Sequence, residues 1–407
     1  MKLSKQSKQL LSFFMKHDHT HYHPPTKKTQ TILKRLYGIL QEAHAHFSPR
    51  KVSMKRVSSV SQITKPRFFN ANSFPEPIRT HIDETVVSEI AFSYSLFDRD
   101  ITVIFMLENE HVDHELEVCT KYMESIAAWL YVLHTYSSKE CATSVTIYLY
   151  FTSLRKWLPT SNVSVLNQNN VNTAFTTSCP AHAEIVVFRK EEWFKVLIHE
   201  TFHSFGLDFS DMRRDTVDKC VLSLFQVQSE VNAYEAYTEF WAEMMNAMFC
   251  AFYHTKDLAS FLSSFDVYIH FERSYSFFQL VKTLQFMGLT YADLLLNTAP
   301  ASVKKKHLYK EKTNVLAYYV LKTVLLNNYQ GFLGWCNTHN FSLLQFKKTI
   351  QNLKDFCEFI KKNCKTKSML LGIQEAEDLF LHLSRSKGGE TLKDILSNMR
   401  MTILELG

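Results

Sequence analysis

The residues with the clearest chemical potential lie in KVLIHETFHSFGLDFS (residues 195–210), where His199, Glu200 and His203 form the pattern H-E-x-x-H. Histidines four residues apart share one face of a helix, so both imidazoles can reach one metal ion. Glu200 is adjacent to them, where it could act on a metal-bound water without being a ligand. The pattern therefore predicts the first half of a catalytic zinc site.

The helix that carries this pattern is predicted to run from about Lys190 to Phe205, with Gly206 as its C-terminal cap. Its other positions are apolar nearly all round, which is typical of a buried helix. Histidines and a glutamate inside a buried helix are costly unless they are paired or coordinated. Because the chain has 18 histidines, chance is the competing explanation, and a third ligand is needed to decide.

A second helix, predicted in SEVNAYEAYTEFWAEMMNAMF, offers that ligand. Glu235, Glu239 and Glu243 are spaced by four and form one stripe among aromatic and aliphatic residues. Three stacked acids repel one another unless a cation or a donor lies opposite them. The stripe could be a solvated face, but no Lys or Arg is interleaved with it, which favours a metal.

HETFH followed by TEFWAE resembles the gluzincin group of zincin metallopeptidases, whose second helix carries the ligand glutamate in an N-E-x-x-A-E or E-x-x-x-D pattern. This resemblance implies that Glu239, 36 positions after His203, is the third zinc ligand. Glu243 would then orient the first histidine, and Glu235 would be a further supporting acid. Thr238 stands where the first of these patterns has Asn.

The metzincin pattern H-E-x-x-H-x-x-G-x-x-H matches only as far as Gly206, because Phe209 stands where the third ligand should be. We therefore reject that subgroup and keep Asp208 as a backup ligand or a partner of a ligand. More of the chain, from about Ser88 onward, resembles uncharacterised zinc metallopeptidases encoded by large DNA viruses. The stretches concerned are FRKEEWFKVLIHETFHSFGLDFS, YEAYTEFWAE, SYSFFQLVKTLQFMGL and EKTNVLAYYVLKTVLL.

A site of this kind would hydrolyse a peptide or protein substrate. Three protein ligands leave the fourth zinc position to water, and Glu200 would serve as the general base. The resemblance implies a side-chain donor for the oxyanion, for which Tyr318 and Tyr319 are candidates, although paired aromatics on an apolar helix are more often core. NVNTAFTTSC is either a substrate-binding edge strand or an ordinary loop and strand. The alternative function is a catalytically quiet zincin-fold protein of a virion or a host interaction.

The order of predicted elements is a strand hairpin in 88–108, a helix, further strands, the H-E-x-x-H helix and then mainly helices. This order predicts an α+β, zincin-like fold in which an N-terminal mixed sheet with helices is followed by a mainly helical C-terminal half. We expect a leader over 1–85, an α+β subdomain over 86–210, and a helical subdomain over 211–407 that carries the third ligand.

The net charge of +6 comes mostly from the first eighty residues and from 303–312. The stretch 1–85 is predicted to be a basic, partly disordered leader with one short helix near 31–44. It could contact nucleic acid or an anionic surface weakly. Its histidines at positions 17–23, 44 and 46 could bind a metal only weakly, because no scaffold is predicted around them.

Eight cysteines are dispersed without a C-x-x-C pair, and the N-terminus lacks the pattern of a signal peptide. We therefore expect reduced thiols and a cytoplasmic protein, in a host cell or virion if it is viral, that is not secreted. No apolar run reaches the ~18 residues that a membrane span needs.

Overall fold

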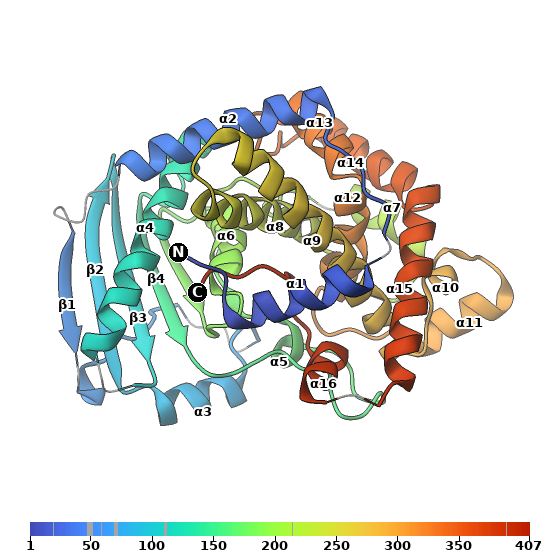
Figure 1. The fold of residues 1–407 in the computed structure, drawn as a ribbon, viewed down its shortest axis with the longest axis horizontal. Coiled ribbons are helices and arrows are strands. Elements are labelled where there is room, and N and C mark those ends of the chain that lie inside the picture. The colour runs from blue at the N-terminus through green and yellow to red at the C-terminus, as the bar shows by residue number, and fades with distance from the viewer. Residues whose placement is uncertain are drawn as a thin grey trace.

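The computed structural model describes residues 1–18, 20–46, 52–57, 59–68, 72–109, 112–213, 215–387 and 389–407, with the side chains of 112–114 left aside. A mixed sheet lies at one side of the molecule, and helices fill the rest (Figure 1). The chain is mainly helical in its C-terminal half, which confirms the coarse α and β arrangement expected from the sequence.

In the part of the chain that the structure describes, six strands form one sheet in the order β1-β2-β3-β4-β6-β5. The predicted hairpin is confirmed, because β2 and β3 pair antiparallel across a short turn. β3, β4 and β6 run parallel, while β1 and β5 pair antiparallel at the two edges. The strands are β1 (Ser53–Val57), β2 (Ser88–Leu96), β3 (Arg99–Leu107), β4 (Ser144–Phe151), β5 (Ala174–Phe175) and β6 (His182–Val187).

Alternation along the strands gives the sheet two apolar faces. Val103, Phe105 and their neighbours on one face join the main core with α4 (Val112–Tyr136) and α6 (Trp193–Ser204). Ile104 and Met106 face the other way, into a smaller core closed by α3 (Glu76–Thr85). The sheet therefore forms the middle layer of a three-layer region.

The H-E-x-x-H helix, α6, begins six residues after β6 ends and is fully buried along its length. At its N-terminal cap, Glu192 adopts a left-handed conformation with φ of 60°. At its C-terminal end, Gly206 has φ of 66°, as the predicted cap requires. Trp129 of α4 donates its indole N–H to Thr201 at 2.8 Å, which fixes the helix against the sheet layer.

The helical half packs against the other side of α6. α8 and α9 are its long central helices, and a π-helical turn, η3 (Leu316–Leu321), runs directly into α12. The remaining helices surround them (Figure 1). The bounds are α7 (Asp215–Phe225), α8 (Ala233–His254), α9 (Leu258–Phe286), α10 (Tyr291–Leu295), α11 (Ala299–Leu308), α12 (Lys322–Asn327), α13 (Tyr329–His339), α14 (Ile350–Asn363), α15 (Lys367–Arg385) and α16 (Glu390–Ser397).

The stretch 1–85 is predicted to be partly disordered, but its described parts are ordered and pack into the fold. Helices α1 (Lys5–His17) and α2 (Lys27–His46) bury apolar stripes such as Leu10 and Phe14 in the main core, and Leu3 pairs with Leu406 near the C-terminus. Both chain ends therefore lie close together (Figure 1). The lysines of α1 and α2 occupy the exposed faces of these amphipathic helices: Lys5, Lys8, Lys16, Lys27, Lys28 and Lys34. Contact with nucleic acid or an anionic surface stays a prediction.

Two disulfides join cysteines that the sequence predicts to be reduced. Cys141 pairs with Cys179, and Cys220 pairs with Cys357. Cys119, Cys250, Cys336 and Cys364 are free thiols in buried positions. The prediction fails because pairing is set by tertiary proximity across 38 and 137 positions, which spacing cannot reveal.

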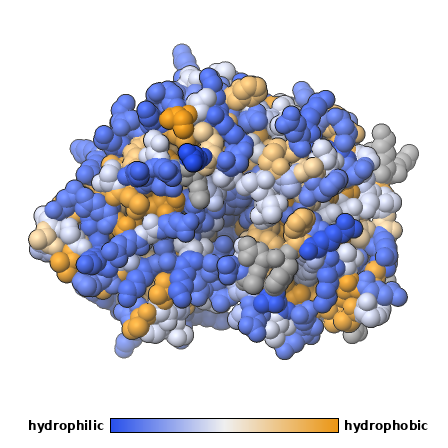
Figure 2. All heavy atoms as spheres, turned by 180° about the vertical axis from the view of Figure 1, so that it is seen from behind, coloured by the Kyte–Doolittle hydropathy of each residue, from blue (hydrophilic) through white to orange (hydrophobic). Residues whose placement is uncertain are grey.

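Among the described residues, no helix is both long enough and apolar enough to cross a membrane. The face in Figure 2 is mostly hydrophilic, with apolar residues in small groups and a hollow near its centre.

Candidate metal centre

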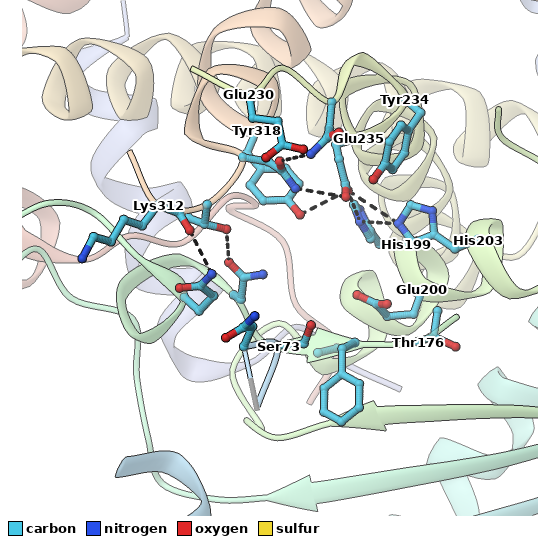
Figure 3. Close-up of a pocket in the computed structure, with 18 of the residues that line it drawn as sticks. Ser73, Thr176, His199, Glu200, His203, Glu230, Tyr234, Glu235, Lys312 and Tyr318 are labelled. Atoms are coloured by element: carbon cyan, nitrogen blue, oxygen red, sulfur yellow. Dashed lines mark hydrogen bonds and ion pairs between the residues drawn. The ribbon is translucent and has the colours of Figure 1, made fainter. Parts of the chain in front are cut away.

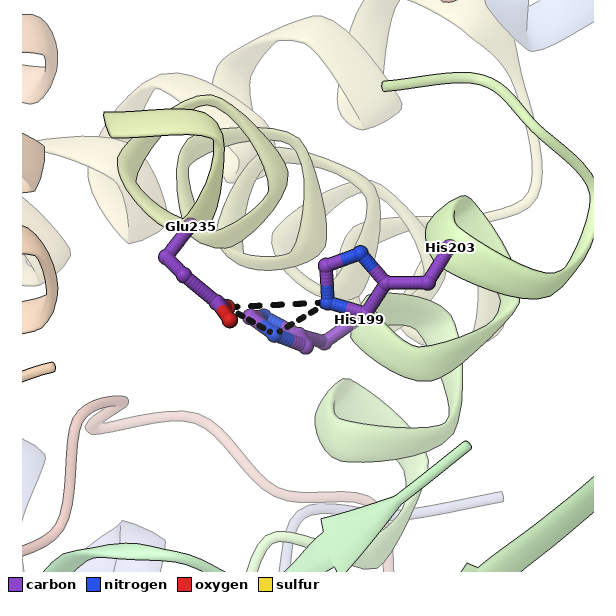
Figure 4. Close-up of side chains that lie close together, drawn as sticks. All are labelled: His199, His203 and Glu235. Carbon is purple, nitrogen blue, oxygen red and sulfur yellow. Dashed lines mark hydrogen bonds and ion pairs between the residues drawn. The ribbon is translucent and has the colours of Figure 1, made fainter. Parts of the chain in front are cut away.

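Two buried helices, α6 and α8, bring the site together, and α8 packs directly against α6. His199 and His203 extend from α6 toward Glu235, which lies in the first turn of α8 (Figure 4). All three side chains are at least nine-tenths buried. Within the part of the chain that the structure describes, they form the one group of three or more His, Cys, Asp or Glu side chains whose ligand atoms come close enough for a metal ion.

The three ligand atoms form a small triangle. His199 Nε2 lies 3.0 Å from Glu235 Oε2 and 3.2 Å from His203 Nε2, and the third side, His203 Nε2 to Glu235 Oε2, is 3.5 Å. In a tetrahedral zinc site with bonds of about 2.0–2.1 Å, ligand atoms are about 3.3 Å apart. The triangle already has these dimensions, so the residues fit a tetrahedral metal ion.

The opposite nitrogen of each imidazole ring faces a carboxylate. His199 Nδ1 lies 2.8 Å from Glu239 Oε2, and His203 Nδ1 lies against Asp208 Oδ2. Carboxylates hold protons at Nδ1 and so leave the Nε2 lone pairs for a metal, an arrangement that metal-binding histidines commonly show. Asp208 thus takes the second of its two predicted roles, as the partner of a ligand. Ser210 supports Asp208 with hydrogen bonds from its amide and its hydroxyl.

Charge compensation is the main electrostatic feature of the cluster. Burial by itself would lower the pKa of His199, but Glu235 and Glu239 outweigh it and raise the pKa to about 9. Burial likewise opposes charge on His203, yet Asp208 and Glu235 raise its pKa well above the usual value. Burial also works against ionised Glu235, but the two histidines lower its pKa. Positive charge among these atoms, from protons on the histidines or from a metal cation, therefore compensates the buried carboxylates.

The third position of the triangle corrects the sequence prediction, because Glu235 and not Glu239 lies with the two Nε2 atoms. Glu239 is one helical turn further along α8, where its Oε2 faces Nδ1 of His199 and its Oε1 accepts a hydrogen bond from Lys195 at 2.6 Å. The candidate third ligand is thus 32 positions after His203. Glu239 has the histidine-orienting role that the resemblance implied for Glu243.

Glu243, one turn further again, is also displaced from its predicted role. Its Oε1 accepts a hydrogen bond from the buried Lys322 of α12 at 2.6 Å, and both side chains are fully buried. Each of the three stacked acids therefore has a cationic partner: Glu235 faces the two histidines, Glu239 faces Lys195, and Glu243 faces Lys322. The cations that make the stripe stable come from α6 and α12, not from α8 itself.

A cavity of about 450 Å³ opens onto the triangle (Figure 3). Glu200 lines this cavity beside the two histidines, as H-E-x-x-H predicts, and burial raises the pKa of its carboxyl. β5 contributes Ala174 and Phe175 to the wall, so the edge strand expected in NVNTAFTTSC does border the site. Most of the remaining lining is amide or hydroxyl side chains: Asn72, Ser73, Gln168, Asn172, Thr176, Ser178, Ser229, Asn232, Thr313 and Asn314.

The side chains of Tyr318 and Tyr319 point in different directions in the structure. Tyr318, on η3, lines the cavity and donates its hydroxyl to Glu235 Oε2 at 3.1 Å (Figure 3). Tyr319 points into the core and donates to the carbonyl of Met399 at 2.8 Å, so its predicted place in the site is wrong. Consecutive residues of a helical turn point in different directions around its axis, so Tyr318 faces the cavity and Tyr319 faces the core.

The sequence did not predict two residues, Asn314 and Lys195, that hydrogen-bond to the acids of the site. Asn314 donates to Glu235 Oε1 at 3.1 Å and is itself held by Asn232 at 2.8 Å. Lys195 holds Glu239. A lysine one turn before His199 in an otherwise apolar helix was a visible signal, whereas nothing in the sequence connects Asn314 with α8.

The N-terminal histidines take other roles. His17 packs against Phe13, His21 packs against His23, and Asp18 pairs with His270. His19 lies outside the described residues. His44 and His46 pack against aromatic rings, among them Phe252 and Phe97.

Comparisons with protein-family models, with curated proteins and with solved structures found no match for this chain.

Proposed function

We propose that this protein is a zinc-dependent hydrolase of peptide bonds, with a gluzincin-like site of His199, His203 and Glu235. The observation that carries the proposal is the triangle of ligand atoms with sides of 3.0–3.5 Å, open to a cavity that Glu200 also lines. A purely structural zinc site has four protein ligands and no need of a cavity or of a neighbouring base. The spacing of Glu235 and Glu239 also matches the E-x-x-x-D pattern, with Glu in place of Asp.

Zinc bound there would supply a Lewis acid and a water of lowered pKa. The carboxylate of Glu200 would take a proton from the attacking water and return it to the leaving amine. Because burial raises the pKa of Glu200, this base is brought closer to neutral pH, where proton transfer in both directions is efficient. The hydroxyl of Tyr318, which already lies at the metal-facing oxygen of Glu235, would donate to the developing oxyanion.

The test is Glu200→Gln, which keeps the shape of the side chain and removes the base. We expect the variant to bind one zinc per chain like the wild type and to lose at least about a hundredfold in cleavage of a proteome-derived peptide library. Undiminished cleavage by Glu200→Gln would refute the mechanism. If the wild type binds zinc but cleaves no peptide in the library, the catalytically quiet alternative would be favoured instead.

A further inference from the structure

Lys195 is connected to the candidate ligand His199 through one carboxylate. It lies one turn before His199 on α6, and its side chain is only 2% exposed. Its Nζ donates to Glu239 Oε1 at 2.6 Å, and Glu239 Oε2 accepts from His199 Nδ1 at 2.8 Å. Lys195 and His199 therefore donate hydrogen bonds to the two different oxygens of the Glu239 carboxylate.

The surroundings hold Lys195 in this position. Met401 Sδ lies 3.8 Å from Nζ, and the amide of Met401 is itself fixed by a hydrogen bond to Glu192 at 2.8 Å. Burial alone would lower the pKa of Lys195, but the charges of Glu239, Glu192 and Glu243 outweigh it and raise the pKa. Lys195 thus stays charged, and its bond to Glu239 persists because no water competes for it.

We infer that Lys195 is a positioning residue for the metal site, which acts by locking Glu239 so that His199 presents Nε2 to the ion. The inference rests on the proposed metal site. A carboxylate held at both oxygens fixes the ring orientation and tautomer of the histidine that it contacts. A carboxylate that has lost its lysine can rotate, and it also adds an uncompensated charge one turn from Glu235 and from Glu243.

The chain contains a matched control in Lys322. Its Nζ donates to Glu243 Oε1 at the same distance, 2.6 Å, and the pair is equally buried. Among the described residues, however, the other oxygen of Glu243 has no hydrogen-bond partner and so contacts no ligand. Loss of either lysine breaks a buried ion pair, but only loss of Lys195 should reach the metal.

The experiment compares Lys195→Met with Lys322→Met by titrating the full-length chain with zinc against a chromophoric chelator. Removal of a residue that supports a ligand typically costs 10–100-fold in metal affinity. We expect a loss in that range for Lys195→Met, accompanied by a changed visible absorption spectrum of the cobalt-loaded protein. We expect Lys322→Met to stay within about threefold of the wild type. Equal affinities of the two variants, or a larger loss in Lys322→Met, would overturn the inference.

A double-mutant cycle identifies the route. In a Glu239→Gln background, Lys195→Met should cause no further loss of zinc affinity, since its only path to His199 has been altered. This double variant also removes both buried charges, so it remains measurable if Lys195→Met alone fails to fold. A further tenfold loss in the double variant would show that Lys195 does not act through Glu239. If the wild type itself binds no zinc, the proposed function is refuted. If the wild type binds zinc but Lys195→Met lowers zinc affinity further in the Glu239→Gln background, only the role of Lys195 is refuted.

Discussion

Replacement of Glu235 by Gln should show that this residue, and not Glu239, is the third metal ligand. Glu235 Oε2 completes the triangle with the two Nε2 atoms, whereas both oxygens of Glu239 face the protein. Structural zinc sites with four protein ligands bind with about 10–16 kcal/mol, or roughly 2.5–4 kcal/mol per ligand. We therefore expect Glu235→Gln to weaken zinc binding by about two to three orders of magnitude.

The matched substitution Glu239→Gln should cost less. The amide oxygen of glutamine can still accept from Lys195, so the variant keeps that hydrogen bond but loses the carboxylate charge that faces Lys195 and His199 Nδ1. Loss of such a supporting contact costs about 10–100-fold in metal affinity. The two variants carry the same Glu→Gln change one turn apart on the same helix, so general damage to α8 should affect them alike.

The assay is competition for zinc between each variant and a chelator of known affinity, with the metal content after dialysis as a second readout. The predicted order of affinity is wild type, then Glu239→Gln, then Glu235→Gln. If Glu239→Gln bound zinc as weakly as Glu235→Gln, or more weakly, the ligand assignment from the metal-free geometry would be wrong. In that case the sequence-based assignment of Glu239 would stand.

Three further outcomes are expected. Tyr318→Phe should lower the rate of peptide hydrolysis by the zinc-saturated protein by about 10²–10³-fold, as loss of one oxyanion donor does. Tyr319→Phe should leave that rate unchanged, and the ratio of the two rates is the measurement. In the metal-free protein the pKa of His199 is raised to about 9, so protonated His199 stabilises the fold fully below pH 6.5, and this contribution is lost as the pH rises through 9. The free energy of unfolding of the metal-free chain, measured with denaturant, should therefore fall by up to about 3 kcal/mol over that window. Replacement of Cys141 and Cys179 by Ser should lower the free energy of unfolding by about 4 kcal/mol, as expected for a 38-residue loop, and an unchanged unfolding midpoint under oxidising conditions would contradict the disulfide.

The sequence predicted correctly that His199, Glu200 and His203 lie on one buried helix, because that placement is local. The spacing of His199 and His203 is a property of one helix, and neither tertiary packing nor loop length alters it. The same holds for the cap at Gly206 and for the hairpin of β2 and β3, which depend on neighbouring residues. These features needed no knowledge of how distant segments meet.

The third ligand could not be assigned in this way. Glu235, Glu239 and Glu243 share one stripe, so helical periodicity makes them equivalent candidates. Their difference lies in how far α8 slides along α6, which depends on packing and on the connection through α7. A shift of one turn, about 5.4 Å, exchanges a ligand for its supporting acid.

The prediction for the N-terminal region was wrong for a different reason. Its charge suggested a solvated leader, yet the apolar positions of α1 and α2, including Leu10, Phe14, Leu33 and Leu36, recur at helical spacing. Net charge describes the exposed face of an amphipathic helix, while periodicity describes the buried one. When the two conflict, the buried face decides whether the segment joins the fold, because burial of each large apolar side chain contributes about 1.5–3 kcal/mol.

The acid stripe of α8 illustrates how a polar network can be specified by elements far apart in the chain. Each acid has a counter-charge from a different source: the histidines of α6 for Glu235, Lys195 for Glu239, and Lys322 of α12 for Glu243. Two of these counter-charges come from lysines, whereas the first comes from imidazoles that are cationic only while they hold protons. A divalent ion at Glu235 would replace those protons, so the stripe has one position at which metal and protons compete. That position is the one that opens to the cavity, where a substrate could enter.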